Sequence, residues 1–131
     1  HNPKAIFIYV GNDIVASEKD KSPDQVLELY KYIVKKLREK FATTPITFLE
    51  ISPSEKRWAA WDQIVQANEL IKSFVASESQ LYYIGSSDQF LGADGKPLTK
   101  YFRDDKLHYN IEGYKVWGNN IKTKVKEIAN K

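Results

Sequence analysis

The sequence contains no cysteine, and this absence excludes several kinds of chemistry. Without a thiol there is no disulfide framework, no thiolate nucleophile and no zinc site with cysteine ligands. Histidine is nearly as scarce, with two residues in a chain of 131. A zinc site needs more than one convergent histidine or thiolate, and a calcium loop needs alternating oxygen ligands with a distal glutamate. We therefore expect no metal site from Asp88, Asp94, Asp104 and His108.

Long apolar runs are also missing. No run approaches the roughly 20 residues that a membrane-spanning helix needs. The net charge is +3, and glutamates interrupt the basic stretches. A nucleic-acid surface gathers its basic residues on one face, so we expect no nucleic-acid partner. The short apolar runs lead us to expect no membrane span. A hydrophobic content of 42% with 28% charged residues is typical of one folded domain. The chain begins at His1, so a targeting segment could precede it, and no compartment is assigned.

Strand and helix patterns alternate along the chain. Apolar, β-rich runs cover Ala5 to Val10, residues 46–51 and residues 81–84. Ser22-Pro23-Asp24-Gln25 is a strong helix start. A second helix is expected over residues 58–76, with Val65 among its inward-facing residues. The last helix begins at Asn110 and has Tyr114 and Val125 on its apolar side. The order β-α-β-α-β-loop-α predicts parallel strands joined by right-handed crossovers, and hence an α/β sandwich.

Ligands of such sheets bind beyond the carboxyl ends of the strands. This rule places Asn12, Ser52, Ser86 and the loop with Asp105 and His108 at one rim. In a turn, the spacing Asp-x-x-His can set a carboxylate beside an imidazole, as serine hydrolases require. The plainer interpretation of the same residues is an exposed loop that leads into a helix N-cap.

The loop belongs to a longer pattern made of Asp94-Gly95-Lys96, Leu98, the stretch 101–110 with Asp105 and His108, Gly113-Tyr114 and Trp117. This pattern resembles the C-terminal block of the SGNH/GDSL hydrolases. The resemblance implies a flavodoxin-like, three-layer α/β sandwich and an esterase, lipase or acylhydrolase activity without metal or organic cofactor. It also implies that His108 is the general base, then acid, and that Asp105 orients its ring.

Gly11-Asn12-Asp13 is similar to the third block of the family, Gly-x-Asn-Asp, although it is one residue shorter. The resemblance implies that Asn12 donates to the oxyanion and that Gly11 lies against the substrate. An ordinary Asn-Asp turn is the alternative. Lys106 stands where the family often has glycine.

The segment after the second strand, with Arg57 and Trp58, also resembles the family. Trp58 and Trp61 could line an acyl or sugar pocket, or Trp61 could be core and Trp58 a cover for the end of the sheet. Arg57 could hold a loop or an anionic substrate. We count Arg57 and Trp58 as candidate substrate-binding residues.

The Gly-Asp-Ser block that supplies the family's nucleophile does not occur in this sequence. Residues 1–131 would then be the C-terminal portion of one SGNH domain, with only its last three strands. Ser86 is a weak substitute, because its surroundings match the family's last strand. The run from Ala5 to Val10 would be an unpaired apolar edge, so we expect a missing N-terminal segment, another chain or a second copy along it. The rival hypothesis is a non-catalytic α/β module, a decayed or half hydrolase, that docks through this strand.

Overall fold

Three parallel strands form one sheet in the order β1-β2-β3. The computed structural model describes residues 2–131. In it, β1 covers Ile6–Ile8, β2 covers Ile46–Leu49 and β3 covers Leu81–Ile84. Ile6 is paired with Ile46, which in turn is paired with Leu81. β2 is therefore the central strand, and β1 and β3 are the two edges.

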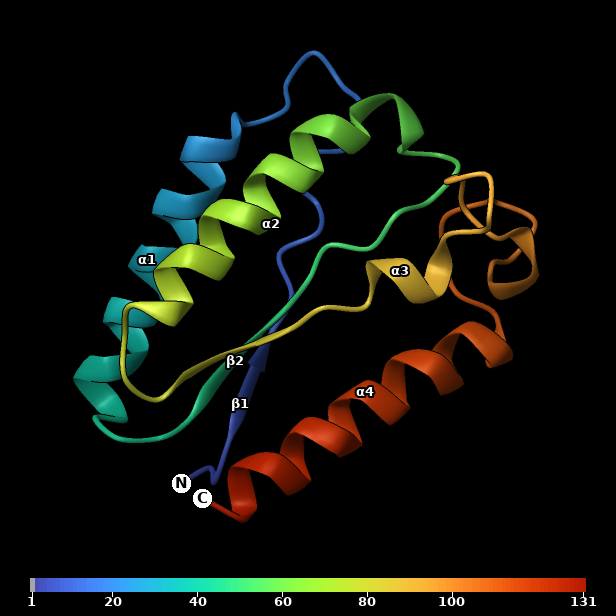
Figure 1. The fold of residues 1–131 in the computed structure, drawn as a ribbon. Helices are drawn as coiled ribbons and strands as arrows, with labels where there is room; N and C mark the ends of the chain where they lie inside the picture. The colour runs from blue at the N-terminus through green and yellow to red at the C-terminus, as the bar shows by residue number, and fades with distance from the viewer. Residues whose placement is uncertain (1) are drawn as a thin grey trace.

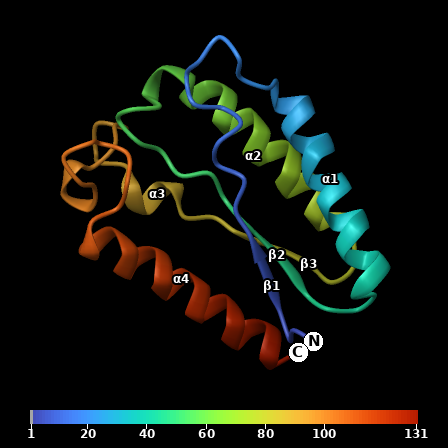
Figure 2. The same cartoon turned by 180° about the vertical axis from the view of Figure 1, so that it is seen from behind.

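Helices cover both faces of this sheet (Figure 1). The long helices α1 (Pro23–Lys40) and α2 (Trp61–Ala76) lie side by side on one face. The C-terminal helix α4 (Ile111–Ala129) crosses the opposite face, as the reverse view shows (Figure 2). Short helical turns η1 (Trp58–Ala60), α3 (Ser87–Phe90) and η2 (Thr99–Tyr101) lie in the connections. The predicted α/β fold with three layers is confirmed.

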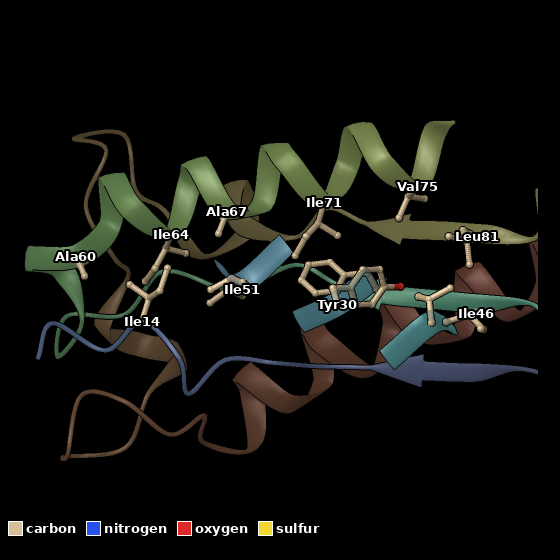
Figure 3. Close-up of a cluster of buried hydrophobic side chains, with 13 residues drawn as sticks. Ile14, Tyr30, Ile46, Ile51, Ala60, Ile64, Ala67, Ile71, Val75 and Leu81 are labelled. Atoms are coloured by element: carbon tan, nitrogen blue, oxygen red, sulfur yellow. The ribbon is translucent and has the colours of Figure 1, made fainter. Parts of the chain in front are cut away.

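The main core lies between the sheet and the α1–α2 layer (Figure 3). α2 contributes a stripe of buried side chains at helical spacing, with Ile64, Ala67 and Ile71 fully buried. The ring of Tyr30 from α1 meets the ring of Phe48 from β2 edge to face, with 4.9 Å between their centroids. This continuous apolar layer fixes the directions of the strands and therefore the rim at which their carboxyl ends meet.

Local signals place the starts of both predicted capped helices correctly. The Ser22 side chain accepts from the backbone N–H of Gln25, and the Gln25 side chain accepts from the N–H of Ser22. This reciprocal pair is a capping box. At the other end of the chain, the Asn110 side chain accepts from Gly113 N–H and begins α4.

Some expectations were wrong at the level of single residues. β1 has three residues instead of six, and they are half-buried because an edge strand has one neighbour. Val65, predicted to face inward, is 37% exposed because it lies at the flank of the buried stripe of α2. Tyr114 and Val125 of α4 are 47% and 43% exposed. Apolar side chains of α4 and the free edge of β1 are thus only partly covered in the described chain.

Candidate active site

A cavity of about 270 Å³ opens at the carboxyl end of the sheet. Its walls come from the segments after β1 and β2, from the loop before α4, and from α4 itself. Of the residues that the sequence places at this rim, Asn12, Ser52 and His108 line the cavity, whereas Ser86 and Asp105 do not. The candidate substrate-binding residue Arg57 lines it as well. The remaining lining residues are Tyr9, Pro53, Ser54, Phe102, Leu107, Tyr109, Tyr114 and Trp117.

Asp105 and His108 form a close pair on the loop before α4. Nδ1 of His108 lies 2.5 Å from Oδ2 of Asp105, while Oδ1 of Asp105 accepts the backbone N–H groups of Leu107 and His108. The bond to His108, and then these two backbone bonds, hold the pKa of the Asp105 carboxyl well below its usual range. Asp105 is thus ionised and accepts from Nδ1 of His108, so in the neutral form of the ring Nε2 is the acceptor.

The loop that carries this pair is closed on itself. Arg103 N–H donates to His108 C=O at 2.8 Å, and Lys106 N–H donates to Arg103 C=O at 2.9 Å. Phe102 and Tyr109 form an antiparallel bridge at its base. Lys106 has a φ of 59°, in the left-handed region that favours glycine. This gives a physical reason for a glycine preference at this position.

Arg57 joins the segment after β2 to the segment after β1. Its Nη1 donates to Gly11 C=O at 2.6 Å, and its Nη2 donates to Oδ1 of Asn12 at 3.1 Å. The phenol of Tyr9 covers Gly11 so closely that a Cβ there would meet its oxygen at 2.1 Å. Burial raises the pKa of the Tyr9 phenol, and the nearby Arg57 opposes that shift. A residue with a Cβ at position 11 would therefore require the Tyr9 ring to move.

Trp58 does not reach the cavity in the described chain. Its ring stacks on Trp61, with centroids 5.9 Å apart and planes inclined by 13°. Trp61 packs against the main core. This arrangement agrees with the interpretation of Trp58 as a cover for the end of the sheet.

The serines at the rim are engaged or buried. Ser86 is 2% exposed and lies outside the cavity lining, and its N–H donates to Glu50, whose carboxylate also accepts from Ser87. Ser52 lines the cavity, and its hydroxyl oxygen is buried beside the Tyr109 phenol, with no hydrogen bond of standard geometry among residues 2–131. Within residues 2–131, no serine hydroxyl is hydrogen-bonded to the His108 ring.

Sequence reasoning did not find the aromatic wall of the cavity. Tyr9 from the end of the first strand segment meets Trp117 of α4 edge to face at 6.0 Å, and Tyr109 lies 6.0 Å from the same Trp117. Burial raises the pKa of the Tyr109 phenol, which keeps this ring neutral. Tyr9 is far from Tyr109 and Trp117 in the sequence, so only the fold brings it to them.

No protein-family model and no curated protein matches the chain. Solved structures do match it. A carbohydrate esterase family 3 protein from Talaromyces cellulolyticus superposes with a TM-score of 0.77 at 18% identity, over 98% of this chain and 60% of that one. The chain has the fold of the GDSL-type esterases and lipases. A GDSL-like lipase from Bacteroides thetaiotaomicron gives a TM-score of 0.75 at 16% identity, over 95% of this chain and 63% of that one.

An acetyl esterase variant solved with an acetate ion also has this GDSL-type fold, with a TM-score of 0.76 at 19% identity. The match covers 98% of this chain and 60% of the acetyl esterase. The chain thus spans about three fifths of the length of these GDSL-type neighbours.

Within residues 2–131, no three metal-ligating side chains gather at one point, and no helix has the length and apolarity to cross a bilayer.

Proposed function

We propose that this chain is the acid/base and oxyanion portion of a serine-type ester hydrolase whose nucleophilic serine lies outside these residues. One observation carries the proposal: the ring of His108, paired with Asp105, lines the same cavity as Asn12. In this arrangement Nε2 of His108 takes the proton of the attacking serine hydroxyl and then gives it to the leaving alkoxide. Asp105 stabilises the imidazolium that forms between these two steps.

Asn12 would stabilise the oxygen that becomes negative when the serine adds to the ester carbonyl. Its carboxamide has two N–H donors, and one such donor is worth about 10²–10³ in kcat. The support for this role is its place on the cavity wall, opposite a loop that already supplies a base.

The size and walls of the cavity favour an ester with a short acyl group. A volume of about 270 Å³ is small for a long acyl chain, and flat aromatic faces from Tyr109, Tyr114 and Trp117 offer stacking surfaces for a sugar ring. Two of the structural neighbours, a carbohydrate esterase and an acetyl esterase, agree with this substrate class.

The free edge of β1 is where the nucleophile-bearing polypeptide would pair. An edge strand presents unpaired backbone groups, and Tyr114 and Val125 of α4 are partly exposed. A missing N-terminal segment, another chain or a second copy would pair with the backbone groups of this edge. The same observation supports the rival function, a non-catalytic module that docks through this strand.

The test compares the 131-residue chain alone with the chain extended by any residues that precede it in its gene product. Each form is treated with a fluorophosphonate probe and a short-chain nitrophenyl ester. We expect labelling of a serine outside these residues, and turnover that is lost in His108→Ala and Asp105→Ala. Asp104→Ala is the matched control, because Asp104 is the exposed neighbour of Asp105.

Two outcomes would decide against the hydrolase. Neither labelling nor turnover in the extended form, or turnover that survives His108→Ala, would refute it. Gel filtration addresses the rival, since a non-catalytic docking module should form a stable complex or self-associate without hydrolysing any ester.

A further inference from the structure

We propose that Arg57 is a positioning residue for Asn12: it holds the side-chain oxygen of Asn12 so that both amide protons point away from the guanidinium, available to the cavity. The inference rests on the proposed function and gives Arg57 a task within it. It assigns to Arg57 a contact with the protein's own oxyanion donor instead of a contact with substrate.

The contact with the guanidinium identifies which atom of the Asn12 carboxamide faces Arg57. Arginine has only N–H donors, so the Asn12 atom at 3.1 Å from Nη2 must be the oxygen. A half-turn of the amide would set N–H groups against N–H groups. A second bond from Nη1 to Gly11 C=O, at 2.6 Å, fixes the backbone of the preceding residue. The two bonds together determine both the place and the rotation of the carboxamide.

Asn12 needs such a restraint because little else holds it. Its side chain is exposed and follows a three-residue edge strand, and within the described chain the Arg57 bond is the only hydrogen bond of its carboxamide. A free carboxamide at the surface would sample several rotamers, and each would have to be ordered in the transition state. A preorganised donor avoids this cost.

The charge of Arg57 has no partner in direct contact. Within residues 2–131 it forms no ion pair and no Asp or Glu lines the cavity, although Arg57 helps to lower the pKa of the nearby Asp20 carboxyl. Tyr9, which also contacts Arg57, stays neutral because burial raises the pKa of its phenol. A cation on the amide oxygen polarises the carboxamide, which strengthens its N–H groups as donors to a negative oxygen. Arg57 thus contributes through Asn12 in charge as well as in geometry.

Arg57→Met tests the first half of the proposal on the 131-residue chain, without any need for turnover. The measurement is the ¹⁵N order parameter of the Asn12 side-chain amide. We expect a restrained amide in the wild type and a disordered one in Arg57→Met. Arg38→Met is the matched control, because Arg38 also donates to three carbonyl oxygens, those of Phe41, Thr44 and Gln80, but lies away from the cavity. It should leave the Asn12 amide restrained.

A double-mutant cycle on the ester-hydrolysing form tests the second half. Arg57→Met should lower kcat by about tenfold or more, within the range that an oxyanion donor controls, and leave KM within about twofold. Asn12→Ala should lower kcat further, and Arg57→Met should have no additional effect in the Asn12→Ala background. A merely structural arginine would lower the stability and the two kinetic effects would multiply.

Three results would overturn the inference: an Asn12 amide that stays restrained in Arg57→Met, a loss confined to KM, or a full Arg57→Met effect in the absence of Asn12. If no form of the protein hydrolyses esters, the proposed function fails. The amide order parameter then decides by itself whether Arg57 positions Asn12.

Discussion

Gly113 and Gly118 lie on the same helix, and the same substitution should act on them in opposite directions. A Cβ on Gly113 would lie 2.2 Å from the carbonyl oxygen of Tyr101 and 2.9 Å from Cβ of Tyr109. A Cβ on Gly118 would meet nothing within 4 Å. Gly113→Ala therefore tests the close packing between the start of α4 and the loop that carries the candidate acid/base pair.

The magnitude follows from what must move. Backbone cannot swing aside as a side chain can, so Tyr101 must retreat by about 1 Å to restore an ordinary carbon–oxygen contact of about 3.3 Å. Such overpacking costs about 1–3 kcal/mol. Tyr101 C=O also accepts the N–H of Asn110 at 3.0 Å, and loss of that bond adds about 1 kcal/mol. The higher helix propensity of alanine relative to glycine offsets up to about 1 kcal/mol of this loss. The net expectation is a destabilisation of about 1–3 kcal/mol.

Gly118→Ala gains helix propensity without any steric conflict, so we expect it to stabilise the folded protein by about 0.5–1 kcal/mol. Urea unfolding of both variants, followed by far-UV circular dichroism, gives the two free energies under one set of conditions. A Gly113→Ala variant as stable as Gly118→Ala would refute the packing described here, because it would mean that the Tyr101 carbonyl does not occupy that space.

The remaining predictions concern the segments on either side of the cavity. Asn68→Ala should lower the free energy of unfolding by about 2–4 kcal/mol, because the buried N–H and C=O of Ile51 both lose their partner, the Asn68 side chain; a loss under about 1 kcal/mol in urea unfolding would contradict this. The Asp105 carboxyl should titrate below the ordinary value of about 3.9 in ¹³C NMR, and His108→Ala should raise its pKa part of the way back. Since the pKa is lowered in the folded state, this contribution to stability is present above about pH 3.9 and is lost as the pH falls through the folded value; an unchanged pKa in His108→Ala would count against the pairing. Lys106→Gly should keep or raise the thermal stability, by up to about 1 kcal/mol, because the position has a left-handed backbone; a clear loss would show that the Lys106–Glu55 ion pair matters more.

The sequence predicts best those features that depend on neighbouring residues. The capping box at Ser22 and Gln25 and the N-cap at Asn110 are local hydrogen bonds, and their residue types announce them. The Asp105–His108 contact is also local, since the two residues stand three positions apart in a turn. The parallel direction of the strands follows from the alternation of strands and helices, because a helical crossover returns the chain to the same end of the sheet.

Contacts across long stretches of chain could not be predicted in the same way. Arg57 meets Asn12 across 45 residues, and the sequence left open whether Arg57 holds a loop or a substrate. The meeting of Tyr9 with Trp117 depends on where α4 crosses the sheet, which no periodicity states. Exposure was misjudged for Val65 for a similar reason, since an apolar residue at the flank of a helical stripe faces inward or outward according to its neighbours.

The hydrogen bonds that shape the Asp105–His108 pair lie within the loop from Arg103 to Asn110. They are the cross-link from Arg103 N–H to His108 C=O and the two backbone N–H groups that donate to Asp105. From the segment after β2, Lys56 N–H donates to Lys106 C=O and Glu55 pairs with the Lys106 ammonium. Under the proposed function, a polypeptide that brought the serine to the edge of β1 would therefore meet a carboxylate–imidazole pair whose geometry local hydrogen bonds already set.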